Sequence, residues 1–159
     1  MKHKILFVCL GNICRSPAAE AVFLQLIKDR KISNDFYLES AGTGSWHVGK
    51  KSDHRMRIAA KKRDIEITSI ARQISITDFD HFDYIITMDN DNLLEVKSLL
   101  SESGLKSDVI IRPLLSYSNS NQTMEVPDPY YGGDSAFDEV LDLLDQACKD
   151  FLESFNLEN

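Results

Sequence analysis

Cys9 and Arg15 stand at the two ends of a short loop, and their spacing suits the chemistry of a phosphate ester. The segment Cys9-Leu10-Gly11-Asn12-Ile13-Cys14-Arg15-Ser16-Pro17 follows an apolar run over residues 5–8 and precedes a helical pattern that starts near Ala18. In such a loop the backbone N–H groups and the first amides of the helix point at one place, and the helix dipole adds partial positive charge there. A cysteine in that field is stabilised as a thiolate nucleophile, and the planar fork of arginine matches two phosphate oxygens. We expect the loop from Leu10 to Ser16 to bind a phosphate, with Ser16 capping the helix and Pro17 at its first position.

A second group of residues lies far along the chain, in Pro127-Asp128-Pro129-Tyr130-Tyr131-Gly132-Gly133. Two prolines fix an acid between them, and two aromatic residues follow. By itself this segment also fits an ordinary turn, because Asp, Pro and Gly are turn formers. Likewise, a Cys and an Arg six residues apart also fit a plain strand-to-helix turn. Together they favour catalysis, because a phosphate ester needs a nucleophile, an anion clamp and a proton donor.

The elements that must position these residues alternate along the chain. Short apolar or β-branched runs predict strands over 5–8, 36–38, 84–87 and 109–111. Apolar residues at helical spacing predict helices from about 18, over 53–63, from 89 (with Leu93, Leu94, Leu99 and Leu100 inside) and after Gly133. The segments 42–52 and 116–134 are expected loops. Strands that alternate with helices indicate an α/β fold with a parallel sheet and helices on both faces. Ligands bind such folds at the carboxyl ends of the strands, which is where Cys9 lies.

Composition limits the class of protein. The chain has 159 residues, which is the size of one domain (1–159), and no apolar run long enough to cross a bilayer. Its three cysteines do not form a disulfide framework, and the short apolar start does not fit a signal peptide, so we expect a cytoplasmic location. The net charge of −7 argues against nucleic acid and membrane surfaces as partners. His47, His54 and His81 lack metal-ligand spacing, and Asp89-Asn90-Asp91 reads as a helix cap rather than a calcium loop.

These motifs resemble those of the low-molecular-weight protein tyrosine phosphatase family. The segment from Cys9 to Pro17 matches the family's signature loop, and further matching stretches follow in the family's order over nearly the whole chain. They are Ser40-Ala41-Gly42-Thr43, Trp46-His47-Val48-Gly49, Ala71-Arg72-Gln73-Ile74, Phe82-Asp83-Tyr84-Ile85, Met88-Asp89 and Asp128-Pro129-Tyr130-Tyr131-Gly132. The resemblance implies a flavodoxin-like domain with a four-stranded parallel sheet and no metal or organic cofactor. It implies phosphotyrosine protein or peptide substrates, inorganic phosphate as product, and a monomer, with a weak dimer left open.

The resemblance also implies roles for individual residues. Cys9 would form a thiophosphate intermediate, Arg15 would bind the transferring phosphoryl group, and Asp128 would act as general acid and then as base. Ser16 would donate a hydrogen bond to the Cys9 thiolate. The cleft for the aryl ring would be walled by Trp46, Tyr130 and Tyr131.

Support for the loop would come from Asn12, with Ser40 as its hydrogen-bond partner. The chain departs from the family at Ser69, where members often carry a histidine that supports the loop. We therefore expect this support to be rebuilt or weaker. Lys50 and Lys51 lie beside the expected cleft. They are either solvated surface residues or residues that favour acidic phosphopeptides as substrates.

Three alternatives stay open beside a tyrosine phosphatase. A thiol arsenate reductase shares the loop but needs further cysteines, and Cys148 lies on an apolar helix stripe that predicts a core position. A phosphoarginine phosphatase tends to carry Thr where this chain has Ile13. A phosphate-binding module without catalysis would not need the full set of nucleophile, clamp and acid. Within the loop, Cys14 reads either as core packing or as a redox partner of Cys9.

Overall fold

The fold is built on a parallel sheet of four strands. In the computed structural model, which describes residues 2–118 and 124–155, these are β1 (His3–Cys9), β2 (Phe36–Gly42), β3 (Tyr84–Thr87) and β4 (Ile110–Pro113). They lie in the order β2-β1-β3-β4, and all neighbours are parallel. This is the flavodoxin-like arrangement, in which the strand order reverses beside β1. The expected α/β class and parallel sheet are confirmed.

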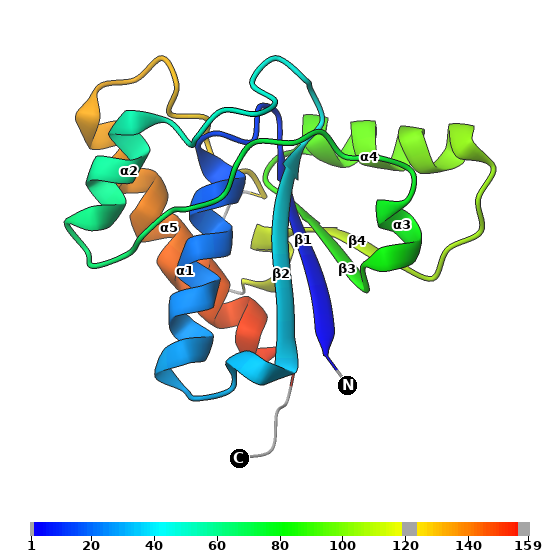
Figure 1. Cartoon of the computed structure of the whole chain (residues 1–159), viewed down its shortest axis with the longest axis horizontal. Helices are drawn as coiled ribbons and strands as arrows, with labels where there is room; N and C mark the ends of the chain where they lie inside the picture. Colours follow the sequence, from blue (N-terminus) through cyan, green and yellow to red (C-terminus); the bar gives the residue numbers. More distant parts are fainter. Residues whose placement is uncertain (1, 119–123, 156–159) are drawn as a thin grey trace.

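Helices cover both faces of the sheet, as Figure 1 shows. On one side lie α1 (Arg15–Asp29), α2 (His54–Lys61) and α5 (Asp134–Glu153), and on the other α3 (Asp78–His81) and α4 (Asn90–Ser103). Short 3₁₀ turns, η1 (Ser33–Asp35) and η2 (Leu114–Tyr117), precede β2 and follow β4. The loops after β1 and β2 and the segment before α5 gather at the carboxyl edge of the sheet, at the top in Figure 1.

The alternation of side chains along β1 divides the core in two. Ile5, Phe7 and Cys9 join a cluster with α1 and α5, whereas Leu6 and Val8 join one with α3 and α4. All five are at least 98% buried, so β1 is the central strand in packing as well as in position. Its last residue, Cys9, is therefore held between two packed layers.

Several boundaries differ from the expectation. α1 begins at Arg15 rather than near Ala18, because the expected phosphate-binding loop, called the phosphate loop from here on, continues directly into the first turn. β2 and β4 run on to Gly42 and Pro113 through their pairing with β1 and β3. The short helix α3 was not expected, and four residues carry too little periodicity to show it. Leu94 was placed on an apolar stripe, but it is 64% exposed and Val96 is the buried residue of that turn. Part of the expected loop 116–134, residues 119–123, lies outside the described residues.

Candidate active site

The sulfur of Cys9 lies at the centre of the loop between β1 and α1. The backbone N–H of Asn12 donates to Cys9 Sγ at 3.3 Å, and the Ser16 hydroxyl lies 3.0 Å from the same sulfur. Ser16 has one proton, which can go to Cys9 or to the Ala41 carbonyl at 3.3 Å. When Cys9 is a thiolate, the Ser16 hydroxyl donates to the sulfur rather than to the Ala41 carbonyl, because hydrogen bonds to a charged acceptor are the stronger ones. A backbone N–H and a hydroxyl therefore both lie at hydrogen-bond distance from the Cys9 sulfur.

Ser16 does not cap the helix, contrary to our expectation. The N-cap residue is Cys14, and no side chain caps this end by a hydrogen bond. The Ser16 hydroxyl is instead occupied by Cys9, by Ala41 and by the side-chain amide of Asn12, which donates to it at 2.8 Å. A phosphate-binding helix end leaves its first amides uncapped by side chains, because those amides are the anion site.

Asn12 holds the loop in an unusual backbone conformation. Its φ is 56°, in the left-handed region that asparagine enters more readily than most residues. Its side-chain nitrogen donates to Ser40 at 2.9 Å as well as to Ser16, and its side-chain oxygen accepts from the backbone N–H of Arg72 at 3.0 Å. The expected pairing with Ser40 is thus present. None of these bonds involves Ser69, so here the support comes from Ser40 and the Arg72 backbone.

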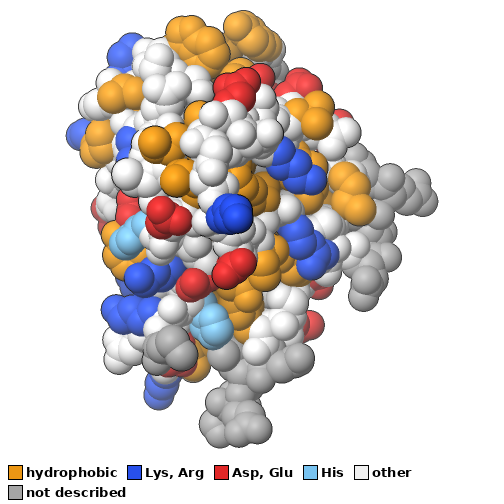
Figure 2. Space-filling view, turned by 90° about the vertical axis from the view of Figure 1, so that its right-hand side faces the viewer, with side chains coloured by type: hydrophobic (Ala, Val, Ile, Leu, Met, Phe, Trp, Pro, Cys, Tyr) orange, Lys and Arg blue, Asp and Glu red, His pale blue; other side chains and the backbone are white. Residues whose placement is uncertain are grey.

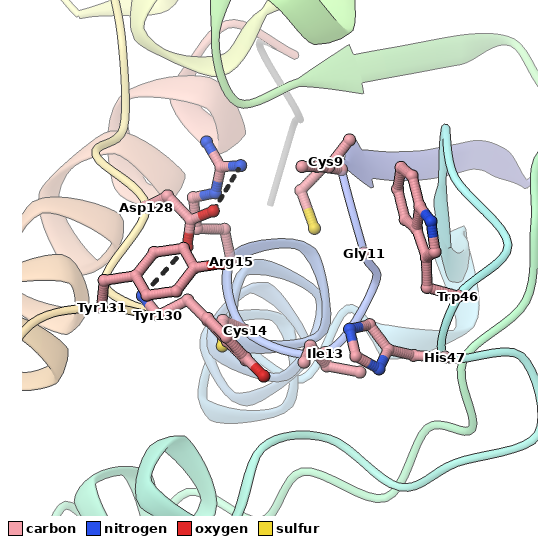
Figure 3. A pocket seen from close by; sticks show the side chains of 11 residues that line it. Cys9, Gly11, Ile13, Cys14, Arg15, Trp46, His47, Asp128, Tyr130 and Tyr131 are labelled. Carbon is pink, nitrogen blue, oxygen red and sulfur yellow. Dashed lines mark hydrogen bonds and ion pairs between the residues drawn. The ribbon is translucent and has the colours of Figure 1, made fainter.

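Arg15 is almost fully buried, with 3% of its side chain exposed, and it carries its charge between acidic partners. Nη1 donates to Asp89 Oδ2 at 2.6 Å and to the Val126 carbonyl at 3.1 Å. Nη2 lies 3.6 Å from Asp128 Oδ2, the upper dashed contact in Figure 3. Burial opposes the charge, but Cys9, Asp89 and Asp128 outweigh it and raise the pKa of Arg15. A permanently charged guanidinium therefore faces the sulfur side of the loop.

Asp128 comes from the segment before α5 and points toward Arg15. Its side chain is 42% exposed, and its Oδ1 accepts from the Tyr130 backbone N–H at 3.0 Å. A turn closes just beyond it, where the Gly132 N–H donates to the Pro129 carbonyl at 2.8 Å. One carboxylate oxygen is thus fixed by the backbone, and the other faces the pocket.

The pocket has a volume of about 420 Å³, and Figure 3 shows it from close by. Trp46 and His47 stand on one side, and Asp128, Tyr130 and Tyr131 on the other, with the loop between them. Trp46 is 68% exposed and Tyr131 95% exposed, so both are side chains of the rim. Asn12 and Ser16, also expected to touch the substrate, are buried and do not line the pocket. The lining residues are Cys9, Leu10, Gly11, Ile13, Cys14, Arg15, Trp46, His47, Asp128, Tyr130 and Tyr131.

His47 also lines this pocket, although it was not among the expected site residues. A Cβ on Gly11 would lie 3.0 Å from the His47 ring, so a glycine at that position makes room for the imidazole. The ring centroid of His47 is 6.3 Å from that of Tyr130. Its place beside Trp46 in the sequence, in a loop expected to reach the cleft, was the available signal.

The other two cysteines differ in position. All three are free thiols, and Cys14 lines the pocket with Cys9. Burial, with help from Asp53 and Cys9, raises the pKa of Cys14. Cys148 is completely buried on α5, with its sulfur 3.8 Å from the Ala19 carbonyl, and burial raises its pKa as well. The expected core position of Cys148 is therefore confirmed.

The described part of the chain offers no metal centre and no membrane-spanning helix. Residues 2–118 and 124–155 contain no group of three or more His, Cys, Asp or Glu side chains placed to hold a metal ion. Within the same ranges, no helix has the length and apolar character to cross a membrane. On the face that carries α3 and α4, basic and acidic side chains are interspersed with hydrophobic ones (Figure 2).

Comparison with known proteins gives the class of the protein. The sequence profile described as low molecular weight phosphotyrosine protein phosphatase matches residues 4–159. The chain is 44% identical over 149 residues to the low molecular weight phosphotyrosine protein phosphatase of Mus musculus, covering 94% of this chain and 93% of the relative. It is 41% identical over 155 residues to a putative low molecular weight protein-tyrosine-phosphatase of Synechocystis, covering 98% of both. The chain therefore belongs to the low-molecular-weight phosphotyrosine protein phosphatase family and is a hydrolase.

Solved structures agree with this assignment. A protein tyrosine phosphatase from Entamoeba histolytica superposes with a TM-score of 0.89 at 43% identity, covering 98% of this chain and 100% of that one. The Drosophila arginine phosphatase superposes with a TM-score of 0.92 at 34% identity, covering 100% of both chains. The fold is thus shared by proteins named for two different phosphoryl substrates.

Proposed function

We propose that this protein hydrolyses phosphotyrosine in proteins and peptides, and simple aryl phosphates, by way of a thiophosphate on Cys9. The observation that carries the proposal is one pocket in which Cys9, Arg15 and Asp128 meet between aromatic walls. These are the nucleophile, the charge clamp and the proton donor that the reaction requires.

In the first step, the Cys9 thiolate attacks phosphorus and the bond from phosphorus to the phenol oxygen breaks. The hydrogen bonds from Ser16 and from the Asn12 N–H hold the sulfur as the nucleophile. Arg15 and the loop amides neutralise the charge on the equatorial phosphoryl oxygens. Asp128, as the protonated acid, delivers its proton to the leaving phenolate.

In the second step, water attacks the phosphorus of the intermediate and the bond between sulfur and phosphorus breaks. Asp128 is now a carboxylate and accepts the proton of that water, since the first step left it in the right form. The Cys9 thiolate departs onto the same hydrogen bonds from Ser16 and Asn12. Inorganic phosphate is released, and the enzyme returns to its starting protonation state.

The aromatic walls supply the preference for an aryl ester. Trp46, His47 and Tyr130 present flat rings around the loop, and offset or edge contacts between rings are favourable beyond simple burial. A phosphoserine places its phosphate on a short aliphatic stem that makes none of these ring contacts. The same pocket should therefore discriminate by the side chain that carries the phosphate.

Phosphoarginine is a second candidate substrate, because the Drosophila structure that matches over the whole chain is an arginine phosphatase. A guanidinium is also planar and stacks on aromatic faces. Ile13, however, presents an apolar wall in the pocket where members of the arginine branch tend to carry Thr. That wall suits a phenyl ring and offers no acceptor to guanidinium N–H groups.

Turnover of four substrates side by side decides between these functions. We expect kcat/KM for a phosphotyrosine peptide and for p-nitrophenyl phosphate to exceed that for a phosphoserine peptide and for phosphoarginine. The matched variant is Ile13→Thr, which should lose selectivity toward the aryl ester if the apolar wall sets it. Preference of the wild-type enzyme for phosphoarginine would overturn the assignment to tyrosine.

The remaining alternatives have less support. A thiol relay of the arsenate reductase type needs a third accessible cysteine, and Cys148 is completely buried in the core. A phosphate-binding module would not need Asp128 fixed opposite Arg15. We also propose that Cys14 protects Cys9 through a reversible disulfide, since both thiols lie in one pocket.

A further inference from the structure

Helix α2 begins beside the phosphate loop and is tied to it. The Asp53 backbone N–H donates to the Ile13 carbonyl at 2.7 Å, in the middle of the loop. The Asp53 side chain caps α2 by accepting from the Arg55 N–H at 2.8 Å. The same carboxylate also binds the Arg55 guanidinium twice, from Nε at 3.2 Å and from Nη2 at 3.0 Å. Arg55 is thus held in one orientation by a residue attached to the phosphate loop.

From that position Arg55 reaches the segment that carries Asp128. Its Nη2 donates to the Tyr130 carbonyl at 3.0 Å. Its Cζ lies 5.5 Å from the centroid of the Tyr130 ring and 4.6 Å from that of the Phe137 ring on α5. Tyr130 in turn donates its backbone N–H to Asp128 Oδ1 at 3.0 Å. A continuous series of contacts therefore runs from Ile13 through Asp53, Arg55 and Tyr130 to Asp128.

We propose that Arg55 is a positioning residue that fixes the distance between the phosphate loop and the general acid. This inference rests on the proposed function, because it assigns Asp128 the role of proton donor. Arg55 is not among the residues that line the pocket. It acts by holding the Tyr130 backbone, which fixes Oδ1 of Asp128 and keeps Oδ2 on the pocket side, beside Arg15.

Arginine is specifically required by this geometry. The guanidinium makes two parallel bonds with Asp53 and a third with a carbonyl, while its flat faces meet two aromatic rings. Lysine has one charged nitrogen and no planar fork, so it cannot serve all these partners together. Arg55→Lys should therefore behave more like Arg55→Ala than like the wild-type enzyme.

The test compares aryl phosphates whose leaving groups differ in their need for a proton. In Arg55→Ala, kcat/KM for phenyl phosphate should fall by roughly 10- to 100-fold, since a small misplacement of a catalytic group has about that cost. The loss should shrink for p-nitrophenyl phosphate, whose leaving group needs little protonation. The vanadate Kd should stay within about threefold, because Cys9, Arg15 and the loop amides remain. The matched control is Arg63→Ala, which removes an arginine that joins the residues after α2 to Asp138 and Asp142 of α5, away from the pocket.

A double variant isolates the route through Asp128. If Arg55 acts by positioning the acid, then Arg55→Ala should cost almost nothing further in an Asp128→Asn background. Equal losses across all leaving groups, or additive losses in the double variant, would overturn the proposal. A wild-type enzyme that hydrolyses no aryl phosphate would instead contradict the proposed function. Thermal unfolding of each variant shows whether Arg55→Ala is folded, and Arg55→Lys serves as the test if it is not.

Discussion

The Arg15 guanidinium donates to Asp89 Oδ2 at 2.6 Å, which aims the fork of the arginine at the phosphate loop. Asp89 performs two tasks, because its other oxygen, Oδ1, accepts from the Asn92 N–H at 2.8 Å and caps α4. The two functions can be separated, since asparagine is as good an N-cap as aspartate but carries no charge. The orientation of Arg15 therefore depends on the negative charge of Asp89, whereas the N-cap of α4 needs only an acceptor oxygen at the place of Asp89 Oδ1.

Asp89→Asn should lower kcat/KM by about tenfold or more with little loss of α4, since hydrogen bonds to charged groups contribute about 1.5–3 kcal/mol. Phosphate and vanadate should also bind more weakly, because Arg15 is less well oriented. Steady-state kinetics and inhibition constants check this. Asp91→Asn, which removes an exposed acid in the first turn of α4, is the control and should change neither. Unchanged vanadate binding in Asp89→Asn would mean that Val126 alone orients the arginine.

The effect of removing Asp128, the proposed general acid, should depend on the leaving group. Asp128→Asn should reduce kcat/KM for phenyl phosphate by roughly 10²–10⁴-fold, the usual contribution of general acid catalysis. The loss should be smaller for p-nitrophenyl phosphate. A series of substituted phenyl phosphates gives the slope of log kcat/KM against leaving-group pKa, which should steepen in the variant. A parallel drop at every leaving group would show that Asp128 only shapes the pocket.

Glu20, on α1, should make stability depend on pH. One of its carboxylate oxygens is buried without a hydrogen-bond partner among the described residues. Burial raises its pKa from 4.5 to about 7, while Ser40 and Arg72 oppose the shift and Glu39 adds to it. The folded state thus prefers the protonated form, so the contribution to stability is full below about pH 4.5 and is lost as pH rises to about 7.

Glu20→Gln should therefore raise the free energy of unfolding at pH 8, by on the order of 2 kcal/mol, and leave it nearly unchanged at pH 4. The corresponding rise in Tm at pH 8 is several degrees. Thermal denaturation at the two pH values measures it. Glu95→Gln, at an exposed position of α4, should show no such difference. If Glu20→Gln is no more stable than the wild-type protein at pH 8, the inference that the folded state favours a neutral Glu20 carboxyl would be wrong.

Oxidation should separate the roles of the two loop cysteines. Peroxide converts the Cys9 thiolate to a sulfenic acid, and attack by the Cys14 sulfur then forms a disulfide and releases water. After peroxide treatment, a thiol reductant should restore the activity of the wild-type enzyme. The activity of Cys14→Ser should not return, because its Cys9 is oxidised further. Cys148→Ser is the control, because that thiol is buried in the core. The same recovery in wild type and Cys14→Ser would remove the protective role.

Local patterns predicted most of the fold, and they singled out Cys9, Arg15 and Asp128, which line one pocket and whose catalytic roles stay a prediction. Strand β1, the helix after Arg15 and the apolar stripe of α5 follow from periodicity, and the Cys9 loop follows from its place between strand and helix. The expected capping role of Ser16 was wrong, because the loop turns its hydroxyl toward the Cys9 sulfur, which is the contact that the family resemblance implied. Helix-capping preference alone does not predict the direction in which that hydroxyl points.

The residue contacts that the sequence did not predict join segments that lie far apart along the chain. Asp89 is 74 residues from Arg15, and Arg55 is 75 residues from Tyr130. Asp89 was correctly expected to cap a helix, but nothing in its neighbourhood showed that a second oxygen would reach an arginine. The sheet order brings these residues together at one edge, so their partnership appears only once the strands are placed.

The proposed mechanism depends most directly on a covalent phosphoryl group on Cys9. Asp128→Asn mixed with p-nitrophenyl phosphate should accumulate this intermediate, because that leaving group needs no acid while the hydrolytic water lacks its base. Acid quenching followed by peptide mass spectrometry should place one phosphoryl group on Cys9, and none should form in the Cys9→Ser and Asp128→Asn double variant. A phosphoryl group on any other residue, or substantial turnover by Cys9→Ser, would contradict the mechanism.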